Sequence, residues 1–167
     1  MAIVVSNASP LILLSGVGEF TRLHDLFGEV RITPQVFDEV VIRGAGRPGA
    51  AEVAAAPFIR KQEAAGIRRI QDLRDQARVA EGEASTIILA DELKADLVLI
   101  DEKAARQAAK AMGLKVAGTM RVLEFAFERK LIADLRATHA MLKAGSARIS
   151  PELLNASLAR FGLPRLS

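Results

Sequence analysis

The sequence contains no cysteine, no tryptophan and no tyrosine, and only two histidines. The absence of cysteine excludes disulfides and thiolate metal sites. Because His24 and His139 lie far apart in segments of helical spacing, we expect surface or packing residues rather than a histidine-rich metal centre. Phenylalanine is the only aromatic residue, so a stacking platform for single-stranded nucleic acid is poorly supported.

Several familiar motifs are also missing. No apolar run approaches the roughly 18 to 20 residues of a membrane span, and no secretory leader pattern is visible at the start. Gly16 and Gly18 lack the third glycine of a dinucleotide fingerprint, and neither a P-loop nor the nucleophile elbow of a serine hydrolase is present. These absences predict a cytoplasmic protein that uses neither a nucleotide cofactor nor a serine nucleophile.

What remains is the pattern of an α/β domain. Half of the 167 residues are hydrophobic, which is enough for one domain with a substantial core. Short β-branched runs alternate with longer segments of helical spacing, as in a parallel sheet covered by helices. The net charge of +3 suits a polyanionic partner without identifying one. We expect strands over residues 3–6, 30–32, 97–100 and 115–117, with a weaker one over 67–70.

Capping signals locate several helices. Ser9-Pro10 and Thr33-Pro34 each combine an N-cap residue with proline at the first helical position, so helices should begin there. Thr119 should cap another helix. Two amphipathic segments, over 134–144 and 151–161, should form a C-terminal helical tail from about residue 134. The connection between these two segments spans residues 145–150.

Polar side chains directly follow two of the expected strands. Asn7 follows the first strand, and Asp101 follows the strand over 97–100. Since the ligand crevice of an open parallel sheet lies at the carboxyl ends of its strands, both should line the floor of one site. Glu39 and Glu83, on helices after turn signals, are candidates for its walls. Carboxylates gathered this way most often hold a hard divalent cation, although Glu83 also suits a stabilising acid in a first helical turn.

The segments around these four residues together resemble the PIN domain family. They are similar above all to a PIN-like subfamily that ends in Gly118-Thr119 and a helical tail. The resemblance implies a single domain over residues 1–167, folded as a three-layer α/β/α sandwich around a mainly parallel sheet. It also implies RNA cleavage with Mg²⁺ or Mn²⁺, often by the toxin of a VapBC-type pair, with a small antitoxin protein as partner and a homodimer as the usual assembly. The matching segments are residues 4–12, 33–40, 82–87 and 99–106.

The family's acidic cluster falls on Asn7, Glu39, Glu83 and Asp101, and the resemblance makes the last three the metal ligands. Asn7 departs from the usual aspartate. Its amide oxygen can coordinate a cation but adds no negative charge. We therefore expect one bound ion rather than two, and slower hydrolysis than in an enzyme with the full cluster.

Basic residues near the site are candidate contacts for substrate phosphates. Arg106 lies about one turn after Asp101 and is the strongest of them, unless it pairs with Asp101 or Glu102 and neutralises the site. Exposed, solvated charge is the alternative for every basic residue in this group. The other basic candidates are Arg43, Arg47 and Lys103. Ser6, Ser9 and Thr119 are candidates for substrate binding, or for donors that orient the site residues, and serve equally well as turn or cap residues.

Two functions stay open from the sequence. The first is a metal-dependent ribonuclease, and the second is a catalytically weak PIN-like module that binds RNA or a protein through the same cleft. Asn7 separates them, because its replacement by aspartate should raise a weakened activity but leave a binding module inert. A third interpretation, in which the acids are only caps and solvated side chains, predicts no cation binding at all.

Overall fold

The structure is a computed structural model that describes residues 2–145 and 149–167. Its strands form one five-stranded sheet in the order β3-β2-β1-β4-β5, and every pairing is parallel. The central strand therefore has β2 and β3 on one side and β4 and β5 on the other. The strands are β1 (Val4–Ser6), β2 (Val30–Ile32), β3 (Ile59–Lys61), β4 (Leu97–Leu99) and β5 (Val116–Ala117).

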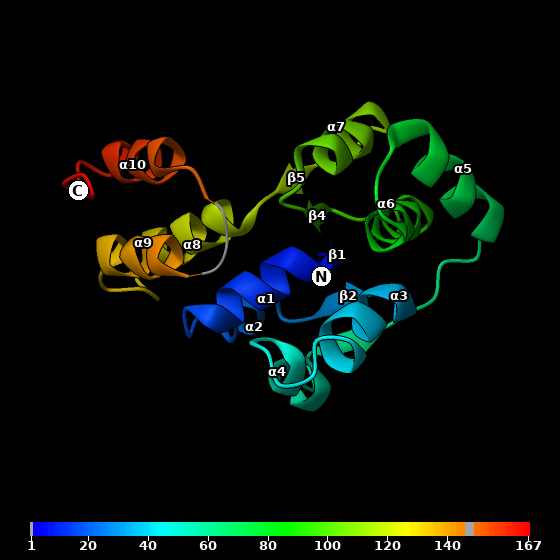
Figure 1. The fold of residues 1–167 in the computed structure, drawn as a ribbon, viewed down its shortest axis with the longest axis horizontal. Coiled ribbons are helices and arrows are strands. Elements are labelled where there is room, and N and C mark those ends of the chain that lie inside the picture. Colours follow the sequence, from blue (N-terminus) through cyan, green and yellow to red (C-terminus); the bar gives the residue numbers. More distant parts are fainter. Residues whose placement is uncertain (1, 146–148) are drawn as a thin grey trace.

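Alternation along the central strands gives the sheet two apolar faces. Val4 and Leu99 belong to one hydrophobic core, and Val5 and Val98 belong to a second core. Sheets that are apolar on both faces need helices on both, and this sheet has them (Figure 1). The three-layer α/β/α sandwich expected from the sequence is confirmed. The first face is covered by α1 (Ala8–Gly16), α2 (Arg22–Phe27) and α8 (Thr119–Glu128), the second by α5 (Ile67–Ala77), α6 (Glu81–Leu93) and α7 (Lys103–Ala111).

The remaining helices lie at the ends of these layers. The chain leaves β2 through α3 (Pro34–Phe37), a π-helix η1 (Asp38–Ile42) and α4 (Ala50–Ala55). The expected C-terminal segments contain α9 (Leu135–Ala144) and α10 (Pro151–Arg160), which lie beside α8 at one end of the molecule (Figure 1). Residues 146–148, within the connection expected over 145–150, lie outside the described residues.

The strand expected over 67–70 is wrong, because this segment begins helix α5. Ile70 is buried and Ile67 is 61% exposed, and the next apolar residues, Leu73 and Ala77, continue at spacings of three and four. This is the period of a helix with one buried face. The true third strand lies at the sheet edge over 59–61, where exposed basic side chains conceal the β pattern.

Helix starts agree with the sequence where a side chain caps locally. Thr33 is the N-cap of α3, and its hydroxyl accepts a hydrogen bond from the Val36 N–H at 3.1 Å. Helix α1 instead begins at Ala8, before the expected Ser9, and α8 begins at Thr119 itself. No helix in the described part of the chain combines the length and apolar character needed to cross a bilayer.

Candidate active site

The ends of β1 and β4 meet at one point of the sheet. Asn7, the residue after β1, donates its backbone N–H to the carbonyl of Leu99 at 2.9 Å. Asp101 follows two residues beyond Leu99, so both candidate floor residues leave adjacent strand ends. The chain order reverses here, with the strands after β1 placed on one side and β4 on the other. Crevices at such switch points are the usual ligand sites of open α/β sheets.

Gly82 allows three elements to converge at this edge. Glu39 lies in the π-helix η1, a rare element that is frequent at functional sites. A Cβ on Gly82 would stand 3.3 Å from Glu39 Oε1 and 3.9 Å from Asn7 Oδ1. Helix α6 is fixed there because the hydroxyls of Thr33 and Ser85 share a hydrogen bond of 2.8 Å. The structure thus brings Asn7 and Glu39 together around the first turn of α6.

Asn7 keeps a free acceptor in this crevice. Its side chain is only 5% exposed. Within residues 2–145 and 149–167 it makes no side-chain hydrogen bond, and it does not cap helix α1. Among the described residues, neither atom of the Asn7 amide is a fully enclosed group without a partner, so both reach the solvent of the crevice. The Asn7 amide is therefore suited to receive a ligand.

Asp101 is held in place by Thr119, 18 residues later in the chain. Its Oδ1 accepts the Thr119 N–H and its Oδ2 accepts the Thr119 hydroxyl, each at 2.7 Å. Thr119 is 1% exposed, so it supports Asp101 rather than facing solvent. A Cβ on Gly118 would stand 2.8 Å from Asp101 Oδ1 and 2.9 Å from Arg106 Nη1, which explains the glycine. Two lone-pair positions of the carboxylate remain open to a ligand.

Arg106 lies beside Asp101 without forming an ion pair with it. Its guanidinium and the Asp101 carboxylate both border Gly118. Among the described residues, however, Arg106 forms an ion pair with neither Asp101 nor Glu102. Of the remaining substrate candidates, Ser6 is buried and donates to the Asn7 carbonyl at 2.9 Å, and Ser9 is partly buried on α1. Arg43 pairs with Asp38 at 3.0 Å. Arg47 and Lys103 are exposed.

Negative charge accumulates around Glu83. Burial raises the pKa of its carboxyl, and the negative charges of Glu102 and, more weakly, Glu39 raise it further, while a hydrogen bond from the Ala80 backbone opposes them. Within the described part of the chain, no arginine or lysine forms an ion pair with any of these three glutamates. The charge is therefore uncompensated. A site of this kind favours a cation.

The donors at this edge fit a hard divalent cation. They are amide and carboxylate oxygens, the ligands that Mg²⁺ and Mn²⁺ prefer. In the described ranges no three Asp, Glu, His or Cys side chains lie close enough together to hold a metal ion, so Glu39, Glu83 and Asp101 do not converge as a complete cage. Mg²⁺ needs only one or two carboxylates because it keeps several waters. The residues present therefore suit one partly hydrated ion.

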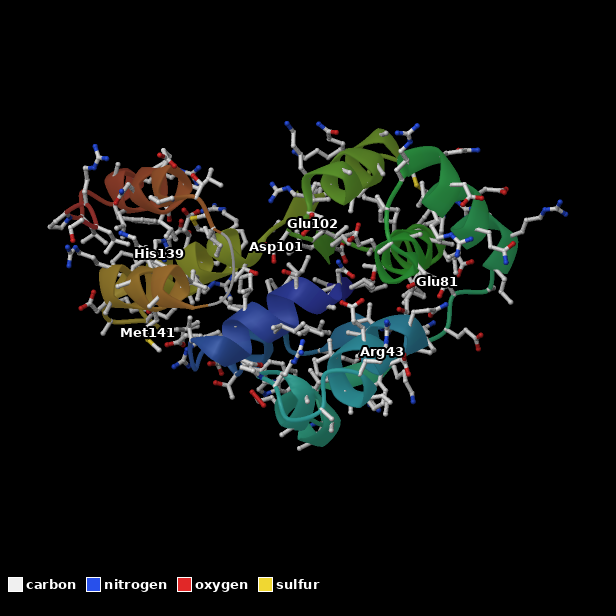
Figure 2. The ribbon with its side chains drawn as sticks, in the orientation of Figure 1. Arg43, Glu81, Asp101, Glu102, His139 and Met141 are labelled. Atoms are coloured by element: carbon white, nitrogen blue, oxygen red, sulfur yellow. The ribbon has the colours of Figure 1, made fainter. Side chains whose placement is uncertain are left out.

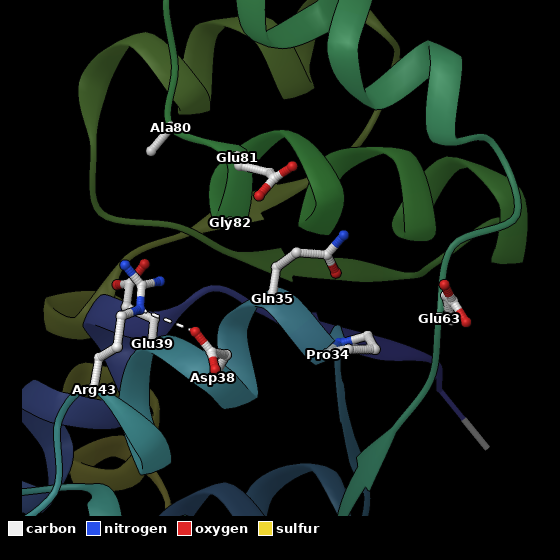
Figure 3. A pocket seen from close by; sticks show the side chains of 9 residues that line it. All are labelled: Pro34, Gln35, Asp38, Glu39, Arg43, Glu63, Ala80, Glu81 and Gly82. Atoms are coloured by element: carbon white, nitrogen blue, oxygen red, sulfur yellow. Dashed lines mark hydrogen bonds and ion pairs between the residues drawn. The ribbon is translucent and has the colours of Figure 1, made fainter.

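A pocket of about 430 Å³ opens beside these acids (Figure 3). It lies between α3 and η1 on one side and the start of α6 on the other, with Glu63 from the segment after β3 at its edge. Glu39 and Gly82 belong both to this pocket and to the convergence with Asn7. The other lining residues are Pro34, Gln35, Asp38, Arg43, Ala80 and Glu81.

Three residues at this edge of the sheet are not predicted from the sequence to take part in the site. Gly82 leaves space for the Glu39 carboxylate, and Gly118 leaves space for the Asp101 carboxylate. Glu102 is the charged residue that raises the pKa of Glu83 most. Each one is adjacent in the chain to a predicted site residue. Adjacency to Glu83, Thr119 and Asp101 was the available signal, but only the folded geometry distinguishes a neighbour that participates from one that points away.

Comparison with known families agrees with this geometry. The family model described as "PIN domain" matches residues 3–163. No curated protein matches the sequence at a significant level.

Proposed function

Because the chain belongs to the PIN domain family, whose fold is of the nuclease type, we propose that it is a metal-dependent ribonuclease that hydrolyses phosphodiester bonds in RNA. One observation carries this proposal. Side-chain oxygens of Asn7 and Glu39 meet around Gly82 at the switch point of the sheet, Glu83 follows that glycine, and the negative charges of Glu39 and Glu102 raise the pKa of Glu83. Acids that are only solvated surface residues need not lie together, whereas a divalent cation must be surrounded by oxygen donors.

The proposed roles follow from position. Asp101, fixed by Thr119, and the side chains of Glu39 and Glu83 would hold Mg²⁺ or Mn²⁺, with the Asn7 amide oxygen as a neutral fourth donor. A bound ion would polarise the phosphoryl oxygen and lower the pKa of a water. Glu39 and Glu83 would act either as direct ligands of the ion or as bases that orient the attacking water.

Arg106 is the proposed contact for a substrate phosphate. It borders the same glycine as Asp101, and its charge is not consumed by an ion pair with that carboxylate. Ser6 and Thr119 act through other groups, since both are buried and donate to the Asn7 carbonyl and to Asp101. Ser9, which is partly buried at the start of α1, is the remaining proposed substrate contact.

We further propose that the protein is a toxin restrained by a small antitoxin, and that it forms a homodimer in the cytoplasm. The support is family membership, because PIN domains often pair with antitoxins. A short open reading frame directly upstream of the gene, whose product copurifies with this chain and suppresses RNA cleavage, is the expected finding.

A second function is favoured by one specific feature. Asn7 supplies no charge, and the three carboxylates do not close into a metal cage in the described structure. A weakly catalytic module that binds RNA or a protein in the same crevice would have this arrangement. The two functions differ in what an added carboxylate at position 7 should do.

The test is Mn²⁺ binding by calorimetry and cleavage of single-stranded RNA, measured in the same samples. We expect the wild type to bind and cleave, Asp101→Asn to lose both, and Asn7→Asp to gain in both. Asp72→Asn is the matched control, because Asp72 is an exposed acid on α5 that does not line the pocket. RNA binding without cleavage in both the wild type and folded Asn7→Asp would establish the binding module instead. Absent Mn²⁺ binding in the folded wild type would reject the metal site.

A further inference from the structure

Helix α7 carries a positive charge equal to that of the whole chain. It contains three basic residues, Lys103, Arg106 and Lys110, and no acidic residue. The chain has 23 lysines and arginines against 20 aspartates and glutamates, so its excess of +3 equals the charge of this one helix. Outside α7 the two signs are therefore equal in number. Positive charge concentrated on one surface helix suits a polyanionic partner.

The three cations share one side of α7. Since an α-helix turns about 100° per residue, positions 103, 106 and 110 fall within an arc of about 60°. Lys103 and Lys110 are exposed and Arg106 is partly buried. Ala105 and Ala109 lie on another side and are fully buried in the core that α7 forms with α6 and β5. Insertion into lipid needs an exposed apolar face, and the apolar face of α7 is occupied by the core.

No other group in the described part of the chain balances these cations. Lys103, Arg106 and Lys110 form no ion pair and no side-chain hydrogen bond there. Helix α9 also has two cations and no acid, but its cations are engaged. Arg136 donates to the carbonyls of Pro164 and Arg165, and Lys143 donates to the Ser167 carbonyl. The cations of α7 are therefore available to a partner.

The basic face of α7, defined by Lys103, Arg106 and Lys110, adjoins the proposed active site. Arg106 Nη1 and Asp101 Oδ1 both border Gly118, and α7 begins two residues after Asp101 (Figure 1). From Lys103 to Lys110 the helix rises about 10 Å. This length corresponds to about three nucleotides at a stacked spacing of about 3.4 Å. A strand with one phosphate beside Asp101 can therefore continue along α7.

We propose that the basic face of α7 binds the phosphates of the RNA strand that continues from the scissile phosphate. This inference rests on the proposed ribonuclease function. Arg106 contacts the phosphate nearest Asp101, and Lys103 and Lys110 contact neighbouring phosphates. Such contacts position the strand and read no bases. Because α7 has no aromatic residue on which bases could stack, its contribution to affinity comes from charge and the release of counterions.

The test is RNA binding measured by fluorescence anisotropy in EDTA, where no metal-dependent cleavage occurs. The probe is a labelled uridine oligomer of about 12 nucleotides, within the usual range of single-strand site sizes. The double variant Lys103→Gln and Lys110→Gln removes two phosphate contacts. We expect the slope of log affinity against log salt concentration to shrink by about 1.4, since each contact to a single strand contributes about 0.7. Near about 0.1 M salt the affinity should fall roughly tenfold.

The matched control is the double variant Arg129→Gln and Lys130→Gln. It removes the same charge from two exposed residues that follow α8, in the helix layer on the other face of the sheet. We expect its affinity to stay within about twofold of the wild type, because exposed charges beyond a Debye length are largely screened. Equal losses in the two double variants would show an effect of net charge alone and would overturn the role of α7.

The outcomes separate this inference from the proposed function. RNA binding that depends on α7, without cleavage when Mn²⁺ is added, would support the basic face and count against the nuclease. RNA cleavage by the wild type, with equal affinity and salt slope in the wild type and the α7 variant, would overturn the basic face while the nuclease stands. Binding of poly-glutamate that depends on Lys103 and Lys110 as strongly as RNA binding does would assign the face to an acidic protein and overturn the inference equally.

Discussion

Two glutamates of this protein are shielded from solvent but differ in whether neighbouring residues balance their negative charge. Glu124 on α8 is 2% exposed and receives three charge-assisted contacts: the Ser157 hydroxyl at 2.5 Å, Arg160 at 3.0 Å and Arg121 at 3.1 Å. Glu83 at the crevice is partly buried, its nearest charged influences are two other glutamates, and no ion pair compensates it within the described residues. The first charge is balanced by the chain itself, and the second is not.

The difference separates a structural polar cluster from a functional one. Ser157 also bonds His139 Nε2 at 2.9 Å, so the contacts of Glu124 tie α8, α9 and α10 together. Figure 2 places His139 among these C-terminal helices, away from Asp101 and Glu102. Uncompensated carboxylates lower stability and persist where a ligand needs them. The contrast teaches that burial alone does not mark a site, whereas burial without internal compensation does.

The largest expected effect is the loss of stability on removing Glu124. Glu124→Leu leaves the buried Ser157 hydroxyl with one partner fewer and breaks both arginine contacts. We expect the free energy of unfolding to fall by about 2–3 kcal/mol, since contacts to a buried charge are worth this much. Urea unfolding followed by circular dichroism measures it.

Glu128→Leu is the control for this substitution. Glu128 is an exposed partner of Arg121 at 3.2 Å, and loss of such a surface pair costs well under about 1 kcal/mol. Equal urea midpoints for Glu124→Leu and the wild type would show that the internal compensation of Glu124 contributes nothing, and the comparison between the two glutamates would then fail.

The sequence predicted those features that depend on neighbours along the chain. The Thr33 cap followed from the residue type and the proline after it. The placement of Asn7 and Asp101 at adjoining strand ends followed from two apolar runs, because parallel strands bring their carboxyl ends to one edge. The two helix layers followed from the alternation of strands with amphipathic segments.

Features that depend on contacts distant in sequence were not predictable. The Thr119 hydroxyl, expected to cap its own helix, instead holds Asp101 from 18 residues away. Nothing in the amphipathic pattern of α8 marks Glu124 as buried, because two of its partners, Ser157 and Arg160, lie on α10. Ile67 and Ile70, three residues apart, fit a short apolar strand as well as one face of a helix, so local sequence alone does not distinguish the two.

An intermediate effect is expected from loosening Asp101. Thr119→Val keeps the shape of the side chain but removes the donor to Asp101 Oδ2, while the backbone donor to Oδ1 remains. We expect Mn²⁺ affinity in calorimetry to fall about tenfold, the lower end for loss of a group that orients a ligand. Thr119→Ser, which retains the hydroxyl, should restore it.

Thr138→Val provides the matched control for the lost hydroxyl. Thr138 is likewise buried, but its hydroxyl donates to the Asp134 carbonyl in the C-terminal helices. An equal loss of Mn²⁺ affinity in Thr138→Val and Thr119→Val would show a general loosening of the fold. Unchanged affinity in Thr119→Val would show that Asp101 needs no second donor.

The smallest effect is a difference in pH dependence between the two regions. The raised pKa of Glu83 means that the folded state binds its proton more tightly than the unfolded state does. Its contribution to stability is therefore complete below the ordinary value of 4.5 and is lost as pH rises through the raised pKa. Burial lowers the pKa of His139, partly opposed by Glu124, so its contribution is present above 6.5 and is lost as pH falls below that value.

Unfolding free energies measured from pH 4 to pH 8 without divalent ions resolve these opposite slopes. Glu83→Gln should be more stable than the wild type at neutral pH, by up to about 1 kcal/mol, because it relieves repulsion from Glu102 and Glu39. That advantage should vanish toward pH 4, where the wild-type carboxyl is protonated, and also when Mn²⁺ binds the wild type. A Glu83→Gln protein that is less stable than the wild type at neutral pH in EDTA would mean that the chain already compensates this charge, and the crevice would then resemble the Glu124 cluster rather than a cation site.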